Sequence, residues 1–316
     1  MSTIHQPMFR SARTLIATAA LTACLALPAR AQQAAPAAPD APAAPAAPKA
    51  PSAPQAPATP AAPTAPAVPA MPAMPAAPKM KELPIEGDKP SAKDIFTKHL
   101  DATGGKVAWE AKKSMIAKGA IEIPAAQLKG SMNTTAAAPD RVAVLMELPG
   151  IGAAGQCFDG TVGWSIDPMR GPSILDAKEV EQIKRDGNFL RDLQMASDPG
   201  TAEVVGLVEF EGTPCWHVRS DGTSYLYAKD TGLMRGTQMT VTTPMGDLPI
   251  TIVTEDYKDF GDVKMATRST SKAMGQTQIM TVDTVEWNSA KDDAFAMPAE
   301  IKALQDAAKS APKPAP

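Results

Sequence analysis

The sequence predicts a mainly β protein with some α structure (α+β). We expect about eleven strands in a curved antiparallel sheet, which forms an unclosed half-barrel capped by two or three helices. Segments between residues 114 and 287 alternate apolar and polar side chains, as strands with one buried face do. Short turn sequences separate most neighbouring segments, which favours hairpins. A single antiparallel sheet of this length must curl or close.

The clearest strands lie in residues 140–168, which predict three consecutive antiparallel strands. Asp159-Gly160 lies between apolar runs and predicts a hairpin turn, and Trp164 follows it. One face of the first strand is strongly apolar because hydrophobic residues recur at every second position. The residues on this face are Val142, Val144, Met146 and Leu148.

Two helices are predicted by capping residues that precede helical spacing of apolar side chains. Ser91 with Asp94 starts the first helix, and Gly104 ends it. Asp176 with Glu179 starts the second, whose apolar stripe reaches position 190. We expect Asp186-Gly187 to weaken the middle of this second helix.

Residues 1–31 have the pattern of a secretory signal peptide, with arginines before an apolar run and Ala29-Arg30-Ala31 as a cleavage site. A second interpretation stays open, because residues 21–24 match a lipobox and would make Cys24 the site of lipidation. Under either interpretation the protein is exported, and we expect it in the periplasm.

Residues 32–90 are expected to form an Ala/Pro-rich linker of polyproline type, disordered or extended. Proline occupies every third position from Pro36 to Pro78, which matches the three-residue turn of polyproline II. The linker is either a stiff spacer or a disordered tether. Residues 91–302 are the predicted half-barrel domain, and residues 303–316 are predicted to be a flexible Pro/Lys tail.

The net charge argues against nucleic acid as a partner, and the cysteines leave two arrangements open. Removal of residues 1–31 would change the formal net charge from −3 to −6, which disfavours nucleic acid. Cys157 and Cys215 could form a disulfide, or they could be two free thiols in separate strands.

No catalytic apparatus is recognisable, and we predict no catalytic residue, no metal site and no cofactor. His99 lies on the apolar stripe of the first helix, where a buried structural histidine is the usual case. His217 lies two residues from Cys215, but two potential ligands on one strand do not make a metal site. No Walker loop, dinucleotide-binding glycine motif or nucleophile elbow is present.

A hydrophobic cavity is the functional feature that the composition favours. Aromatic residues make up only 4% of the chain, whereas it contains 17 methionines, several of them on predicted strands. Methionine adapts to varied apolar partners, although it also fills gaps in ordinary cores. A long sheet with few aromatics leaves room for an acyl chain. The residues predicted to line this cavity are Val142, Val144, Met146, Leu148, Trp164, Met239, Ile252 and Met280.

The order of these motifs resembles the periplasmic lipoprotein carriers, the LolA/LolB-like or outer-membrane lipoprotein-sorting proteins. Ala138-Pro139-Asp140 leads into an apolar strand, and Asp159-Gly160, Trp164 and Asp167-Pro168 follow. The turn at residues 230–232 and the closing Phe-x-x-Pro of residues 295–298 agree with it. The resemblance implies an unclosed barrel with a helical lid and a cavity for acyl chains. The carriers have an arginine where this chain has Ala138.

We therefore predict a non-enzymatic periplasmic binding protein whose partners are lipid or lipoprotein acyl chains, with a role in outer-membrane lipoprotein sorting. The alternative is a tethered envelope sensor or protein-interaction domain with a self-filled core and an envelope protein as partner. We expect a monomer in both cases.

Overall fold

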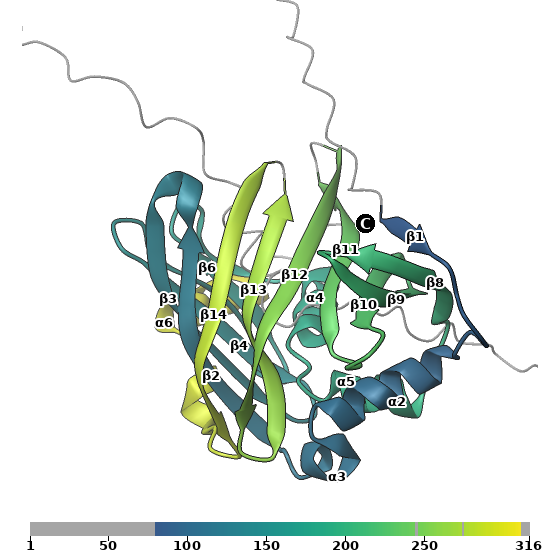
Figure 1. Cartoon of the computed structure of the whole chain (residues 1–316). Coiled ribbons are helices and arrows are strands. Elements are labelled where there is room, and N and C mark those ends of the chain that lie inside the picture. Colours follow the sequence, from purple (N-terminus) through teal and green to yellow (C-terminus); the bar gives the residue numbers. More distant parts are fainter. Residues whose placement is uncertain (1–79, 244–245, 274, 311–316) are drawn as a thin grey trace, which may run out of the picture. The chain divides into compact units, whose positions relative to one another are not determined.

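The computed structural model describes residues 80–243, 246–273 and 275–310. Within them, one antiparallel sheet of fourteen strands is accompanied by five α-helices (Figure 1). None of these described helices has the length and apolar character needed to cross a membrane. The helices are α2 (Ala92–Ala102), α3 (Gly105–Glu110), α4 (Ala177–Asp186), α5 (Arg191–Ser197) and α6 (Ala299–Ser310).

The strands follow the chain as a meander that is interrupted once, by α4 and α5. The first group is β1 (Lys81–Leu83), β2 (Ser114–Ile123), β3 (Leu128–Ala137), β4 (Arg141–Leu148), β5 (Gly152–Phe158), β6 (Gly163–Asp167) and β7 (Gly171–Ile174). The second group is β8 (Glu203–Phe210), β9 (Thr213–Ser220), β10 (Thr223–Ala228), β11 (Met234–Thr243), β12 (Gly246–Phe260), β13 (Val263–Ala273) and β14 (Gln276–Trp287).

The sheet is unclosed because its two edge strands, β1 and β7, do not pair with each other. The strand order is β1-β8-β9-β10-β11-β12-β13-β14-β2-β3-β4-β5-β6-β7. The last strand, β14, returns to pair with β2 and joins the two halves of the meander. The predicted fold class is confirmed, but the sheet has fourteen strands rather than about eleven. The edge strands β1 and β7 contain only three and four residues, too few to show an alternating pattern.

The folded domain extends beyond the boundaries expected from the sequence. Strand β1 pairs with β8 although its residues lie in the predicted linker of residues 32–90. Helix α6 continues from Ala299 to Ser310, past the predicted start of a flexible tail at residue 303. The predicted signal peptide, Cys24 and the proline register of residues 36–78 lie outside the described residues.

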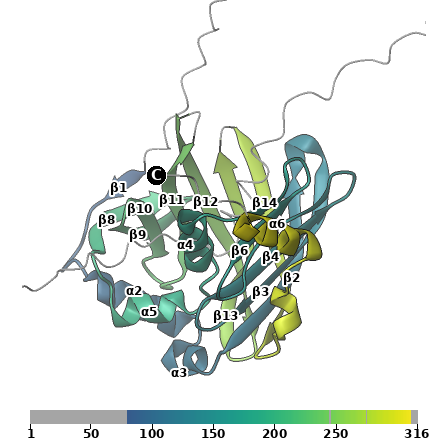
Figure 2. The same ribbon diagram turned by 180° about the vertical axis from the view of Figure 1, so that it is seen from behind.

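The helices lie on both faces of the curved sheet (Figures 1 and 2). We call the face that carries Met115, Val142 and Tyr225 the concave face. Helices α2, α3 and α5 contribute to one core cluster with residues of this face. Helix α4 packs on the same face over β4 and β5. Helix α6 packs on the outer face, against β7.

The local signals for the helices are confirmed at their starts. Ser91 and Asp94 form a capping box at α2, and Asp176 and Glu179 form another at α4. The second predicted helix is in fact two helices, because α4 ends at Asp186 and α5 begins at Arg191. A Cβ atom on Gly187 would lie 2.2 Å from a methyl group of Val142, so a larger residue at this position would have to displace the sheet contact. The break therefore lets the chain approach the sheet closely.

Candidate functional site

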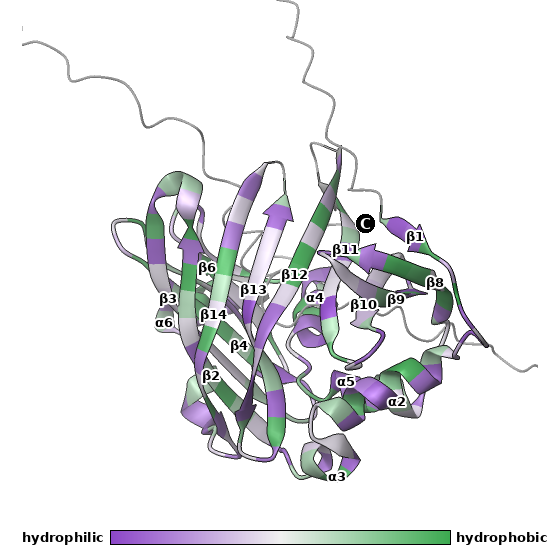
Figure 3. Cartoon of the chain, in the orientation of Figure 1, coloured by the Kyte–Doolittle hydropathy of each residue, from purple (hydrophilic) through white to green (hydrophobic). Residues whose placement is uncertain are grey.

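The concave face carries an apolar surface that we call the apolar sheet patch. Its register brings Met132, Met146 and Ala154 side by side on β3, β4 and β5. Figure 3 shows hydrophobic segments, coloured green, on β12 and β14, two other strands that contribute to the patch. The buried members of the patch are Ile121, Met132, Met146, Leu148, Ala154, Leu248, Ile250, Ile252, Ala273 and Met280, and Ile151, Met239 and Val241 border them.

No residue of a described helix belongs to the apolar sheet patch, whose members all come from strands and one strand-connecting turn. This distinguishes it from the other two clusters on the concave face, to which helices contribute. Five predicted cavity residues lie in the patch or at its border. They are Met146, Leu148, Met239, Ile252 and Met280.

Two further predicted cavity residues, Val142 and Val144, lie on the same face but beneath helix α4. They cluster with Phe158, Leu175 and Ile183. Val142 therefore packs against the protein's own helix. Val144 also lines an open groove of about 220 Å³ between β4–β7 and the start of α4, and Met146 connects this groove with the apolar sheet patch.

The prediction that Trp164 lines the cavity is wrong. Trp164 lies opposite Cys157 in the ladder between β5 and β6, and Cys157 lies opposite Ala143. Because Val142 and Val144 flank Ala143 in β4, Trp164 projects from the other face. There it clusters with Ile301 of α6. The position of Trp164 could have been predicted from the two-residue alternation along β4 and the register of the Asp159-Gly160 hairpin.

Both cysteines are free and buried, so the structure shows the two separate thiols rather than a disulfide. Cys157 and Cys215 belong to different core clusters. Burial raises the pKa of each thiol to about 12. Since the thiolate is the nucleophile and metal ligand, neither cysteine is poised for chemistry.

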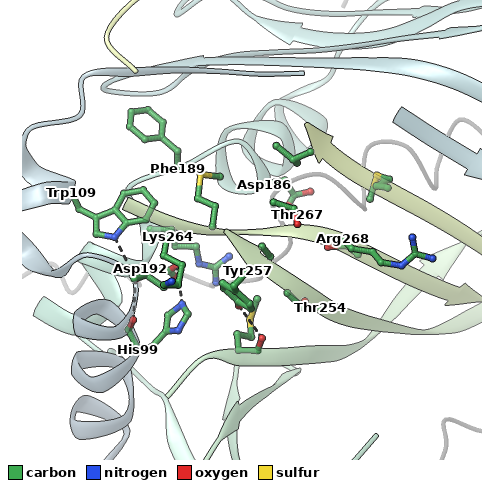
Figure 4. Close-up of a pocket in the computed structure, with 18 of the residues that line it drawn as sticks. His99, Trp109, Asp186, Phe189, Asp192, Thr254, Tyr257, Lys264, Thr267 and Arg268 are labelled. Carbon is green, nitrogen blue, oxygen red and sulfur yellow. Dashed lines mark hydrogen bonds and ion pairs between the residues drawn. The ribbon is translucent and has the colours of Figure 1, made fainter. Parts of the chain in front are cut away.

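A second feature, which we call the polar cavity because ionisable and hydroxyl-bearing residues form part of its otherwise apolar lining, adjoins the apolar sheet patch. It has a volume of about 130 Å³ and lies between the α4–α5 segment and strands β12–β14 (Figure 4). Met280 lines the polar cavity and also belongs to the patch. Phe189, Met265 and Val282 supply apolar lining, and Thr254, Thr267 and Ser269 supply hydroxyl groups.

Asp186, the last residue of α4, is the most unusual group in the polar cavity. Its side chain is buried, and its Oδ2 atom accepts a hydrogen bond of 2.6 Å from Nε2 of Gln182. Its Oδ1 atom is buried and has no hydrogen-bond partner among the described residues. Burial raises the pKa of Asp186 to about 6, against the opposing effects of Gln182, Arg185 and Arg191. The sequence marks Asp186 only as a position that weakens the helix.

His99 also borders the polar cavity, where it joins three elements. Its Nδ1 atom lies 3.0 Å from the carbonyl oxygen of Gly232, and Nε2 lies 3.3 Å from Oδ2 of Asp192. The ring also contacts Tyr227 edge-on. These contacts hold α2 against α5 and the β10–β11 turn, which is the structural role expected of a buried histidine.

His217 lies on the outer face, where its Nε2 atom is 2.8 Å from Oγ of Ser224. Burial lowers its pKa, and Arg219 lowers it further. Within the part of the chain that the structure describes, no group of three or more His, Cys, Asp or Glu side chains could hold a metal ion.

No family model matches the chain. No curated protein matches it either. Among solved structures, the chain is similar to a LolA superfamily protein from Nitrosomonas europaea, with 10% identity, 66% of this chain and 99% of that chain covered, and a TM-score of 0.47. A DUF1329 family protein from Desulfovibrio piger shows 11% identity, coverage of 65% and 95%, and a TM-score of 0.46.

A putative outer membrane lipoprotein-sorting protein domain from Vibrio parahaemolyticus is similar at 11% identity, with coverage of 64% and 95% and a TM-score of 0.43. Identities this low concern the fold, so the function of this chain has to be argued from its own residues.

Proposed function

We propose that the protein binds the acyl chain of a lipid or lipoprotein on the concave face of its sheet and does so without catalysis. The observation that carries this proposal is the apolar sheet patch, to which no described helix contributes. The other clusters of the concave face include side chains from helices of the domain. Met146 and Met280 of the patch line the open groove and the polar cavity, so these two residues are where an apolar ligand would meet the patch.

The chemistry of the patch suits a flexible hydrocarbon chain. Burial of one methylene group contributes about 0.8 kcal/mol, so a long acyl chain gains substantial binding free energy without any polar contact. Three methionines, Met132, Met146 and Met280, are buried in the patch, and a fourth borders it. Methionine side chains adapt their shape, which suits chains of different length.

The same proposal places the domain in the cell envelope. Its basis is the signal-like sequence of residues 1–31 and the proline register of residues 36–78. A polyproline II segment rises about 3.1 Å per residue, so this register could extend over about 130 Å. The linker would then hold the domain at a distance from an attached N-terminus. The envelope-sensor alternative shares this arrangement but requires no lipid.

The test uses the uncharged fluorescent probe N-phenyl-1-naphthylamine and competing lipids. We expect Met239→Glu, which introduces a charge at the border of the patch, to weaken probe binding at least tenfold. The matched control is Thr240→Glu, because Thr240 is exposed on the other face of the same strand. We expect this variant to bind the probe as the wild type does.

Native mass spectrometry of protein purified from the periplasm provides a second test, with bound lipid as the expected result. Lipid-free protein that also fails to bind the probe would contradict the proposal and favour the envelope-sensor alternative. Equal weakening by both glutamate variants would show that probe binding does not depend on the concave face.

A further inference from the structure

We propose that the polar cavity is a head-group subsite, which selects a single-chain amphiphile whose head is uncharged and donates a hydrogen bond to Oδ1 of Asp186. This inference rests on the function proposed above and adds the chemical class of the ligand. The acyl chain would lie on the apolar sheet patch, and the head, a hydroxyl or an amide, would occupy the cavity.

The need for a donor follows from the environment of Asp186. The residue is 7% exposed and lines the polar cavity, yet Oδ1 has no described partner (Figure 4). Leaving a buried acceptor unsatisfied costs about 1–3 kcal/mol, and more for a charged group. A ligand that donates to Oδ1 removes this cost, whereas a ligand that only accepts hydrogen bonds leaves it in place.

The cavity has room for a head group rather than for one ordered water molecule. Its volume is about 130 Å³, whereas a single water molecule requires only about 10–15 Å³ on the same measure. Hydroxyl groups of Thr254, Thr267 and Ser269 line the strand side of the space, opposite the α4–α5 segment. They provide polar surroundings for a small head such as a hydroxyl or a glycerol.

The charges around the cavity favour an uncharged head. Four basic side chains line it, against the two acidic ones of Asp186 and Asp192. A cationic head would therefore face an excess of like charge. A carboxylate head would place a negative charge beside Asp186 and would offer no donor to Oδ1. The basic residues are Arg185, Arg191, Lys264 and Arg268.

The subsite and the apolar sheet patch share one residue. Met280 of β14 belongs to the lining of the polar cavity and to the patch. Its cross-strand neighbours lie on either side of this junction, since Ser269 lines the cavity and Ile121 belongs to the patch. An amphiphile with its head beside Asp186 can therefore begin its chain at Met280.

The decisive experiment compares ligands of equal chain length on the full chain, by displacement of N-phenyl-1-naphthylamine. The ligands are tetradecanol, its methyl ether, tetradecylamine and myristate. We expect tetradecanol to bind at least tenfold more tightly than the ether, because a site built for a donor rejects an analogue that lacks one. We expect the amine and the carboxylate to bind more weakly than the alcohol. Monomyristoylglycerol and tetradecanamide then distinguish a glycerol head from an amide head.

Variants of Asp186 test the assignment to this residue. Asp186→Leu should reduce the difference between alcohol and ether to less than twofold, whereas Asp186→Asn keeps an acceptor and should preserve most of it. If Asp186→Leu fails to fold, the comparison of alcohol with ether on the wild type and on Asp186→Asn still tests the inference. Equal binding of alcohol and ether by the wild type would overturn the inference but leave acyl-chain binding intact. Failure of every ligand and of the probe itself would overturn both proposals.

Discussion

At the scale of single residues, Asp186 shows how burial creates a chemical property that composition does not reveal. The carboxyl group lies at the end of α4, directly before a glycine that approaches the sheet. Its pKa rises from 3.8 to about 6, chiefly because burial disfavours the charged form. The folded protein therefore holds the proton more tightly than the unfolded chain does.

This property predicts a pH-dependent effect of Asp186→Asn on stability. Below about pH 3 the carboxyl is protonated in both states, so the variant and the wild type should differ little. Between about pH 4 and pH 6 the unfolded chain releases the proton while the folded protein retains it, so the wild type loses stability over this range and the asparagine variant does not. One pKa unit corresponds to about 1.4 kcal/mol, so the variant should be more stable at pH 8 by up to about 3 kcal/mol.

Urea denaturation at pH 3 and pH 8 measures this difference. Asp230→Asn is the control, because Asp230 is exposed in the β10–β11 turn. We expect it to change stability by the same small amount at both pH values. A pH-independent effect of Asp186→Asn would contradict the assignment of a raised pKa to Asp186.

At the scale of the elements, glycine determines how closely α4 packs on the sheet. Gly187 approaches Val142 of β4, and Gly163 of β6 approaches Val180 of α4. Each of these two contacts therefore pairs a glycine on one side with a valine on the other. The backbone of Gly187 has a φ of −87°, which any residue can adopt. Its requirement for glycine is therefore steric and arises only in the folded domain.

We predict that Gly187→Ala lowers the free energy of unfolding by about 1–3 kcal/mol, the range typical of overpacked cores. The reason is the distance of 2.2 Å between the new Cβ atom and a methyl carbon of Val142. Gly206→Ala in β8 is the matched control, since a Cβ atom there would meet no atom within 4 Å. Equal stability losses in the two variants would show that the α4 contact is not the cause.

At the scale of the whole molecule, the C-terminal helix completes the domain on the outer face. Ile301 of α6 is fully buried against Trp164 and Phe295. Leu304, one turn later, is 40% exposed. The last helix therefore contributes to the outer core, and the domain does not end at residue 302.

We predict that Ile301→Ala destabilises the domain by about 2–5 kcal/mol, the usual cost of such a truncation in a packed core. Leu304→Ala is the control on the same helix and should cost less than about 1 kcal/mol. Chemical denaturation followed by tryptophan fluorescence measures both variants. Similar small effects would mean that α6 is a weakly attached segment.

Local chemistry explains which features were predictable. Ser91 with Asp94, Asp176 with Glu179 and the strand alternation around Val144 act over three or four residues, so the sequence shows them directly. The number of such strands predicted a sheet that curls or closes, and the family resemblance implied that it stays unclosed. Edge strands β1 and β7 were missed because pairing with β8 and β6, rather than local pattern, holds them in the sheet.

Local pattern in the sequence was enough to predict the class of the fold, the capped helix starts and an apolar face on β4. Which residues share a site depends on strand register and helix placement, and these emerge only from long-range packing. Register put Trp164 on the outer face, and α4 covered Val142. The break at Gly187 brought Asp186 into a cavity beside Met280, a residue almost a hundred positions away, where burial gives the carboxyl its distinctive chemistry.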